Sequence, residues 1–247
     1  MKSDLLLEAV NISKNFGSVK ALDRVNFSVH RQEIVGLLGD NGAGKSTLVK
    51  IISGFHQPDN GELLIEGVKT ELRSPAMSRR LGIETIYQEL ALVDDLSIYR
   101  NMFLAKELRR RRLGVLNLLD DKRMREEAER ALGDLKIDIS SVRDPVRFLS
   151  GGQRQSVSTA RAVMSDAKLF LMDEPTAALG VAESRQVLSI IRELKNKGKS
   201  VVVITHNIRH IVSICDRVVI MRRGKAVADM AAQGLSVDDV EDMIVGN

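Results

Sequence analysis

The stretch Gly39-Asp40-Asn41-Gly42-Ala43-Gly44-Lys45-Ser46 decides the fold of this 247-residue chain. It matches the phosphate-loop pattern G-x-x-x-x-G-K-[ST], follows an apolar run at 34–38 and precedes a helical pattern. Its glycines let consecutive backbone amides approach phosphate oxygens without an obstructing Cβ. We expect Lys45 to reach the β- and γ-phosphates of a nucleotide and Ser46 to bind Mg²⁺ at the start of the helix. A glycine-rich turn without a ligand is the less favoured alternative.

Short β-branched or leucine-rich runs alternate with helical patterns around this loop, which predicts an α/β fold with a largely parallel, buried sheet. The expected strands are 5–10, 25–29, 34–38, 63–65, 83–86, 169–173, 201–205 and 218–221. The expected helices are 45–53, 97–103, 122–132, 152–164, 182–195 and 208–214. No strand is expected between about residues 92 and 146. We therefore predict one domain, with an α/β core (1–91 and 147–247) and an inserted helical subdomain (92–146).

A second apolar run, Leu169-Phe170-Leu171-Met172, ends in Asp173 and Glu174. Open α/β sheets bind ligands at the carboxyl ends of their strands. Because side chains alternate along a strand, we expect Asp173 to hold the Mg²⁺ shell and Glu174 to accept a proton from an attacking water. Solvated acids at a strand end are the alternative, and the phosphate loop favours the functional interpretation.

Leu149-Ser150-Gly151-Gly152-Gln153 is the third signal, and with the two nucleotide motifs it resembles the signature of the ATP-binding-cassette (ABC) ATPase family. The order of motifs is similar over nearly the whole chain. The resemblance implies a P-loop NTPase core with an antiparallel β subdomain and an inserted α-helical subdomain. It also implies that the signature, with Ser150 as a helix N-cap, closes over the γ-phosphate held by a second copy in a head-to-tail dimer.

The resemblance assigns further residues to the ATP site. It implies that Gln88 touches the Mg²⁺ shell and senses the partner subunit, that His206 contacts the γ-phosphate and orients the water, and that Phe16 stacks on adenine. Taken alone, Gln88 reads as a loop amide and Phe16 as a core residue. The catalytic residues implied are Glu174, His206 and Gln88, and the metal-binding residues are Ser46, Gln88 and Asp173. The nucleotide-binding residues implied are Phe16, Gly39, Asn41, Gly42, Ala43, Gly44, Lys45, Ser46, Thr47, Ser150, Gly151, Gly152 and Gln153. The other histidines, expected to be structural or on the surface, are His30, His56 and His210.

One departure from the family pattern follows Glu174. Family members usually read Ser-Ala-Leu-Asp where this chain reads Ala177-Ala178-Leu179-Gly180. The aspartate that braces the opposite subunit's site is therefore Gly180 here, which leaves the communication between the two ATP sites open. Hydrolysis is still expected, because the residues for it are all present.

Composition limits the other classes of function. Aromatic residues make up 3% of the chain, which disfavours stacking on single-stranded nucleic acid, and the net charge of 37 − 33 = +4 does not require DNA or RNA. The single cysteine, Cys215, excludes an internal disulfide and a multi-cysteine metal site. The N-terminal segment lacks a secretory pattern, and no apolar run approaches the roughly 20 residues of a membrane span. We therefore expect a chain that reaches the membrane only through a partner.

The stretches 39–54 and 174–180 look most like bacterial ATPases of monosaccharide importers, of the ribose, xylose and fructose type. This resemblance implies ATP and Mg²⁺ as cofactors and a location at the cytoplasmic face of the inner membrane. The implied partners are a second copy of the chain, transmembrane permease subunits that dock near residues 89–103 and, indirectly, a solute-binding protein, with no nucleic acid. An ABC ATPase for an amino acid or a lipid, and a soluble ABC ATPase acting on nucleic acid, are the alternatives.

The run Arg109-Arg110-Arg111-Arg112 lies inside the predicted helical insertion. We expect a solvated helix end or loop there. Contact with anionic lipid headgroups or with an acidic loop of a permease is the alternative.

Overall fold

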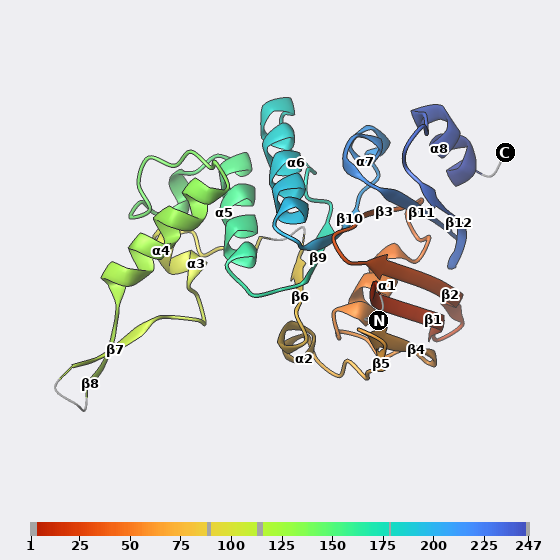
Figure 1. Ribbon diagram of the computed structural model, residues 1–247, viewed down its shortest axis with the longest axis horizontal. Coiled ribbons are helices and arrows are strands. Elements are labelled where there is room, and N and C mark those ends of the chain that lie inside the picture. The colour runs from red at the N-terminus through yellow and green to blue at the C-terminus, as the bar shows by residue number, and fades with distance from the viewer. Residues whose placement is uncertain (1–3, 88–89, 113–115, 178, 246–247) are drawn as a thin grey trace. The chain divides into compact units, whose positions relative to one another are not determined.

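A computed structural model describes residues 4–87, 90–112, 116–177 and 179–245 of the chain (Figure 1). The chain divides into unit 1 (residues 1–88, 167–175 and 191–247) and unit 2 (residues 89–166 and 176–190). These units differ from the predicted division at residues 92 and 146, because Val157, Ala160 and Ile190 belong to the apolar core of unit 2. The assignment of the whole chain to one domain stays a prediction.

Unit 1 contains a six-stranded sheet whose neighbouring strands are parallel except for one pair at its edge. Every residue of its third and fourth strands is buried, as expected of parallel strands covered on both faces. The predicted parallel sheet is therefore confirmed. Its strands, in spatial order, are β12 (Lys225–Ala231), β11 (Arg217–Arg222), β3 (Ile34–Leu38), β10 (Ser200–Ile204), β9 (Leu169–Asp173) and β6 (Ile83–Ile86).

A second sheet of unit 1 is antiparallel, as the family resemblance implies. Its spatial order is β2 (Val19–His30), β1 (Leu5–Phe16), β4 (Asn60–Ile65) and β5 (Val68–Lys69). β1 and β2 have 12 residues each and extend beyond the predicted strands. Register shifts interrupt the pairing of β1, one of them at Asn11, whose φ is +52°. Because such bulges break the alternation of apolar and polar residues, the sequence pattern hides the full length of the hairpin.

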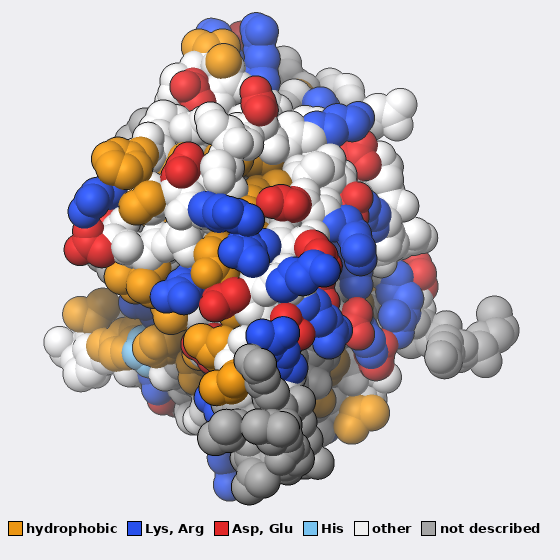
Figure 2. Space-filling model, turned by 90° about the vertical axis from the view of Figure 1, so that its left-hand side faces the viewer, with side chains coloured by type: hydrophobic (Ala, Val, Ile, Leu, Met, Phe, Trp, Pro, Cys, Tyr) orange, Lys and Arg blue, Asp and Glu red, His pale blue; other side chains and the backbone are white. Residues whose placement is uncertain are grey.

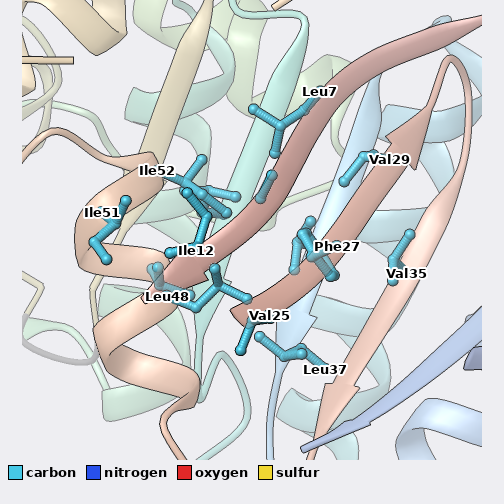
Figure 3. Packing of buried hydrophobic residues seen from close by; sticks show 14 of the residues in the cluster. Leu7, Ile12, Val25, Phe27, Val29, Val35, Leu37, Leu48, Ile51 and Ile52 are labelled. Carbon is cyan, nitrogen blue, oxygen red and sulfur yellow. The ribbon is translucent and has the colours of Figure 1, made fainter. Parts of the chain in front are cut away.

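The helix that follows the phosphate loop, α1 (Lys45–Ile52), is held by packing. Its Leu48, Ile51 and Ile52 are fully buried and point toward Ile12 of β1 (Figure 3). A helix of eight residues is too short to be stable by itself in water. Each of these buried aliphatic side chains contributes roughly 1.5–3 kcal/mol relative to an exposed one. The apolar face of α1 therefore fixes the position of the loop before it.

The described residues of unit 1 form three further helices, α2 (Pro75–Arg80), α7 (Ile208–Ile214) and α8 (Val237–Val245), and include the last part of α6 (Val181–Asn196). α7 packs closely on β3, since a Cβ on Gly36 would lie 3.1 Å from Ile211 Cδ1 and 3.2 Å from Cys215 Sγ. Burial raises the pKa of the Cys215 thiol, so this cysteine stays protonated at neutral pH. Of α2, α7 and α8, only α7 was predicted.

Unit 2 is built around an apolar cluster that includes Met102, Met124 and Val157. These residues come from three different helices. The elements of unit 2 are α3 (Ile98–Met102), β7 (Arg109–Arg112), β8 (Leu116–Leu119), α4 (Asp121–Asp134), the short 3-10 helix η1 (Val146–Phe148), α5 (Gly151–Val163) and the first part of α6 (Val181–Asn196). Across the described ranges of the whole chain, no helix combines the length and the apolar character that crossing a membrane requires.

The prediction of no strand between residues 92 and 146 is wrong. β7 pairs antiparallel with β8, with Arg109 opposite Leu119 and Arg110 opposite Leu118. The arginine run is therefore one strand of a hairpin and not a helix end or loop. Backbone pairing holds such a ribbon without the apolar alternation that sequence prediction relies on.

Arg109 and Arg110 of this hairpin are exposed. On the face shown in Figure 2, Lys and Arg side chains stand among Asp and Glu side chains. On α4 such neighbours form ion pairs, for example Arg123 with Glu127 at 2.8 Å. The charge on this face is therefore mixed in sign, and a contact of the arginines with anionic lipid or a permease stays an untested alternative.

Candidate functional site

The phosphate loop joins β3 to α1 and packs against two other strands of unit 1. Gly39 and Gly44 have φ values of +142° and +104°, in the region that favours glycine. A Cβ on Gly39 would meet the carbonyl carbon of Met221 at 3.1 Å, and one on Gly44 would meet Ala21 O at 2.7 Å. A Cβ on Gly42, by contrast, would meet nothing within 4 Å. The loop is thus packed against β11 at Gly39 and against β2 at Gly44. It is open at Gly42, where a ligand can approach the backbone amides of the loop.

Lys45 is buried at the start of α1 and donates hydrogen bonds to its own loop. Its Nζ lies 2.6 Å from Gly39 O and 2.9 Å from Asp40 O. Burial lowers the pKa of Lys45, while the charges of Glu174, Asp40 and Asp173 act in the opposite direction. The ammonium group therefore stands within electrostatic reach of both acids at the end of β9.

Glu174 follows β9 in a strained backbone conformation. Its φ is +49°, which is uncommon for a residue with a Cβ, and its amide donates to Ile204 O at 2.7 Å. Glu174 Oε2 accepts a hydrogen bond from Thr205 Oγ1 at 2.9 Å, and Oε1 accepts one from the His206 amide at 3.1 Å. The left-handed turn thus directs the carboxylate of Glu174 to the end of β10.

His206 is the second side chain at this carboxylate. Its Nδ1 lies 2.8 Å from Glu174 Oε1, and its side chain is 76% exposed where that of Glu174 is 18% exposed. A neutral imidazole carries one N–H. If Nδ1 donates a hydrogen bond to Glu174, Nε2 of the neutral ring can only accept one, for example from a water. For Nε2 to donate to a phosphate, the ring must carry both protons or must give up its hydrogen bond to Glu174. The hydrogen bond that Nε2 can make thus depends on the one that Nδ1 makes with Glu174.

Asp173, at the last position of β9, has an elevated pKa. Burial raises it and the neighbouring Glu174 charge raises it further, whereas Lys45 and Lys50 lower it. Within the described residues, no three or more His, Cys, Asp or Glu side chains group to hold a metal ion. The donors here are the Asp173 carboxylate and the exposed Ser46 hydroxyl. This oxygen donor set fits Mg²⁺ that is bound together with substrate phosphates.

We expect Mg²⁺-dependent binding of ATP to weaken on acidification earlier than an ordinary aspartate would cause. In its predicted role as a metal ligand, Asp173 must be ionised, and its raised pKa means that it takes up a proton at higher pH. Below that pKa the affinity should fall by up to about tenfold per pH unit. Mg²⁺ titrations of ATP binding between pH 8 and pH 5 measure this. ATP itself titrates in the same pH range, so the control is Asp173→Asn. This variant should bind ATP more weakly, and its affinity should change less with pH. If the affinities of the two proteins fell in parallel with pH, Asp173 would not be the metal ligand.

Phe16 ends β1 with its ring 45% exposed. His56 contacts it edge-on with ring centroids 5.3 Å apart, and Lys14 Nζ lies 5.7 Å from its centroid. A half-exposed aromatic side chain suits stacking on a planar ligand ring. Adenine stacking by Phe16 stays a prediction. The sequence placed His56 among structural or surface histidines and carried no signal for this contact.

The signature begins α5 in unit 2. Ser150 is its N-cap, as the resemblance implies: Ser150 Oγ accepts from Gln153 N at 3.2 Å, and Gln153 Oε1 accepts from Ser150 N at 3.1 Å. This capping box fixes the first turn of the helix. Gly151 is exposed, whereas Gly152 is buried.

The structure brings Lys45, Asp173, Glu174 and His206 together in unit 1. Gln88 lies outside the described residues, as does Ala178. Thr205 was missed as a hydrogen-bonding partner of Glu174, although its place directly before His206 at a strand end was a usable signal.

Comparisons with known proteins show the family to which the chain is similar. The family model described as "ABC transporter" matches residues 22–177. A xylose/arabinose import ATP-binding protein of Sulfolobus acidocaldarius is 49% identical over 97% of this chain and 93% of its own length. A fructose import ATP-binding protein of Rhizobium meliloti is 41% identical over 100% of this chain and 96% of its own.

Two solved structures resemble the fold. An ATP-binding cassette of an ABC transporter aligns with a TM-score of 0.85 and 26% identity over 98% of each chain. A dimeric cassette in a post-hydrolysis state with ADP and Pi aligns with a TM-score of 0.77 and 26% identity, covering 93% of this chain and 100% of its own.

Proposed function

Since this chain belongs to the ABC transporter family of ATP-binding proteins, we propose that it hydrolyses ATP to drive import of a monosaccharide through a separate membrane permease. The observation that carries the hydrolysis is the Glu174 carboxylate, held 2.8 Å from His206 Nδ1 and within electrostatic reach of Lys45. The observation that supports the sugar is the similarity to the two sugar-import proteins.

Binding of ATP begins at the phosphate loop. The open side at Gly42 admits the phosphates to the loop amides, and Lys45 exchanges the carbonyl oxygens of Gly39 and Asp40 for phosphate oxygens. Phe16 stacks on the adenine. Ser46 and Asp173 would hold magnesium, with Gln88 as a further predicted ligand, and the bound ion would offset the charge of the phosphates.

Cleavage requires a water in line with the γ-phosphate. Glu174 accepts the proton of this water, because its carboxylate is fixed by Thr205 and His206 rather than free to rotate. His206 holds Glu174 from one side and, through Nε2, faces the phosphate or the water. Lys45 stabilises the charge that develops on the phosphoryl oxygens.

The signature completes the site from a second copy of the chain. The capped first turn of α5 presents backbone amides and the positive end of a helix dipole, which suits an anion. In a head-to-tail dimer, each signature contacts the γ-phosphate bound by the other copy. Loss of phosphate then removes this contact and reopens the dimer, and the permease converts this cycle into transport. The permease thereby holds the chain at the cytoplasmic face of the membrane.

The test is ATP turnover by the chain assembled with its permease in lipid vesicles, with the solute-binding protein on the other side. We expect one of a panel of pentoses and hexoses to stimulate turnover when it is bound to the solute-binding protein. The chain carrying Glu174→Gln serves as the control, since it should bind ATP without stimulated turnover. Stimulation by an amino acid or a lipid instead would overturn sugar import. Stimulation by nucleic acid without any permease would overturn transport altogether.

A further inference from the structure

Two glycines of unit 2 share one neighbour, Glu183, in the first turn of α6. A Cβ on Gly152, in the signature, would overlap Glu183 Cγ and lie 2.6 Å from Glu183 Cβ. A Cβ on Gly180 would overlap Glu183 Oε2 and lie 3.4 Å from Glu183 Cδ. Neither glycine has a positive φ. Glycine therefore fits at both positions because it has no side chain, and not because of its backbone freedom.

The two contacts differ in kind. At Gly152 the neighbouring atoms include the Cβ of Glu183, which the backbone of α6 fixes, so the first turn of α5 packs directly on the first turn of α6. At Gly180 the neighbour is the far end of the side chain. In an aspartate, each carboxylate oxygen is two covalent bonds from the Cβ. Oε2 of Glu183 lies at about that distance from the point where residue 180 would have its Cβ. Position 180 thus has a carboxylate beside it without carrying one.

These contacts lie on the chain that leaves Glu174. Glu174 is followed by Pro175, the last residue of this part of unit 1, and unit 2 resumes at Thr176. Gly180 O then accepts a hydrogen bond from Ser184 N at 2.9 Å, which starts α6. Gly180 is therefore bound to the same helix turn that contacts the signature at Gly152.

We propose that Glu183 is a positioning residue that couples the signature turn to the segment following Glu174, with its carboxylate in the place of the side chain that residue 180 lacks. This inference rests on the proposed function, in which Glu174 acts on the ATP of its own chain and the signature on that of the partner copy. A shift of the signature turn on meeting the partner's phosphate moves Glu183 through Gly152. Glu183 in turn moves Gly180 and the chain that leads back to Glu174. Each copy thereby links one ATP site to the other.

An acid in the first turn of a helix also stabilises the helix through its dipole. That role alone predicts a lower melting temperature for Glu183 variants, and unchanged turnover at temperatures where the variants are fully folded. Coupling predicts a loss of turnover in the folded protein. It also predicts that a carboxylate supplied from position 180 can replace that of Glu183.

The experiment measures three quantities on the full chain: the affinity for Mg²⁺-ATP at dilute protein, the turnover as a function of protein concentration, and the melting temperature. For Glu183→Gln, which keeps the packing on Gly152, we expect ATP affinity within about twofold of the unaltered chain and turnover lower by about 3- to 30-fold. Glu183→Ala should lose turnover similarly. The matched control is Glu193→Gln in the same helix, a residue for which the described part of the chain shows no side-chain hydrogen bond or ion pair; it should change none of the three.

The decisive variant is Gly180→Asp. In the unaltered background it should lower turnover, because two carboxylates would compete for one place. Combined with Glu183→Ala, the same substitution should raise turnover above that of Glu183→Ala alone. Unchanged turnover in Glu183→Gln, or no recovery in the double variant, would overturn the inference while leaving the proposed function intact. Turnover of the unaltered chain that is strictly proportional to its concentration would overturn the proposed dimer and the inference with it.

Discussion

Replacing Glu174 by Gln is expected to lower ATP turnover by roughly 10²–10⁴-fold, the range that a positioned general base contributes. The substitution keeps the size of the side chain. It removes the acceptor for the proton of the attacking water and one of the two oxygens that now accept hydrogen bonds from Thr205 and the His206 amide. Affinity for ATP should stay nearly unchanged, because Lys45 and the loop amides are intact. Turnover and nucleotide binding on the same preparation measure both effects.

A matched control for this prediction is Thr205→Val, which removes the hydroxyl that donates to Glu174 Oε2 but leaves the base in place. It should cost less than Glu174→Gln, since the His206 amide and Nδ1 still hold Oε1. If Glu174→Gln retained the turnover of the unaltered chain, Glu174 would not be the base, and its left-handed backbone would need another explanation.

Replacing Lys45 by Met is expected to abolish binding of ATP at ordinary concentrations. Methionine preserves an unbranched, apolar stem but removes the ammonium group. Loss of one partner of a buried, hydrogen-bonded charge pair costs about 2–5 kcal/mol. At ~1.4 kcal/mol per tenfold change, this is roughly a 30-fold or larger loss of affinity. Calorimetric titration with Mg²⁺-ATP measures it.

The Lys45 substitution also has an effect on the empty protein. Without Nζ, the carbonyl oxygen of Gly39 loses the lysine donor, whereas Asp40 O keeps its hydrogen bond from the Ala43 amide at 3.1 Å. We expect only a small loss of stability, because removing a buried cation offsets part of the cost of the lost hydrogen bonds. The control is Lys197→Met, an exposed lysine of the same unit outside the loop, which should bind ATP as the unaltered chain does. Equal affinities of the two variants would refute the role of Lys45.

The sequence predicts best those parts in which local pattern and chemistry coincide. The phosphate loop needs glycines at fixed positions, and β9 is a continuous apolar run ending in two acids, so the residues alone suffice to place both. The hairpin of β7 and β8 could not be predicted in this way, because four consecutive arginines carry no strand pattern and the ribbon is held by backbone pairing. β12 was missed although its exposure alternates, since alanines at alternate positions make that alternation weak.

The division into units was predicted only in part, for a related reason. The signature helix was assigned to the α/β core by its neighbours in the sequence, yet Val157 and Ala160 pack in the cluster of unit 2. Tertiary packing decides which apolar cluster a helix joins. The hydrophobic periodicity of the helix's own sequence does not show it. The contact of His56 with Phe16 likewise joins a loop residue to the end of β1, 40 residues apart in the chain (56 − 16), and the two positions share no motif.

The half-buried thiol at the end of α7 has a practical consequence. Cys215 is the only cysteine of the chain, and burial raises the pKa of its thiol, which disfavours the reactive thiolate at neutral pH. A thiol introduced on the surface would therefore be modified selectively by maleimide or methanethiosulfonate reagents, with no need to delete a native cysteine first. Fluorescent or paramagnetic probes attached near Ser150 and near the phosphate loop would then report, by their separation, whether and when two copies approach each other during a round of hydrolysis.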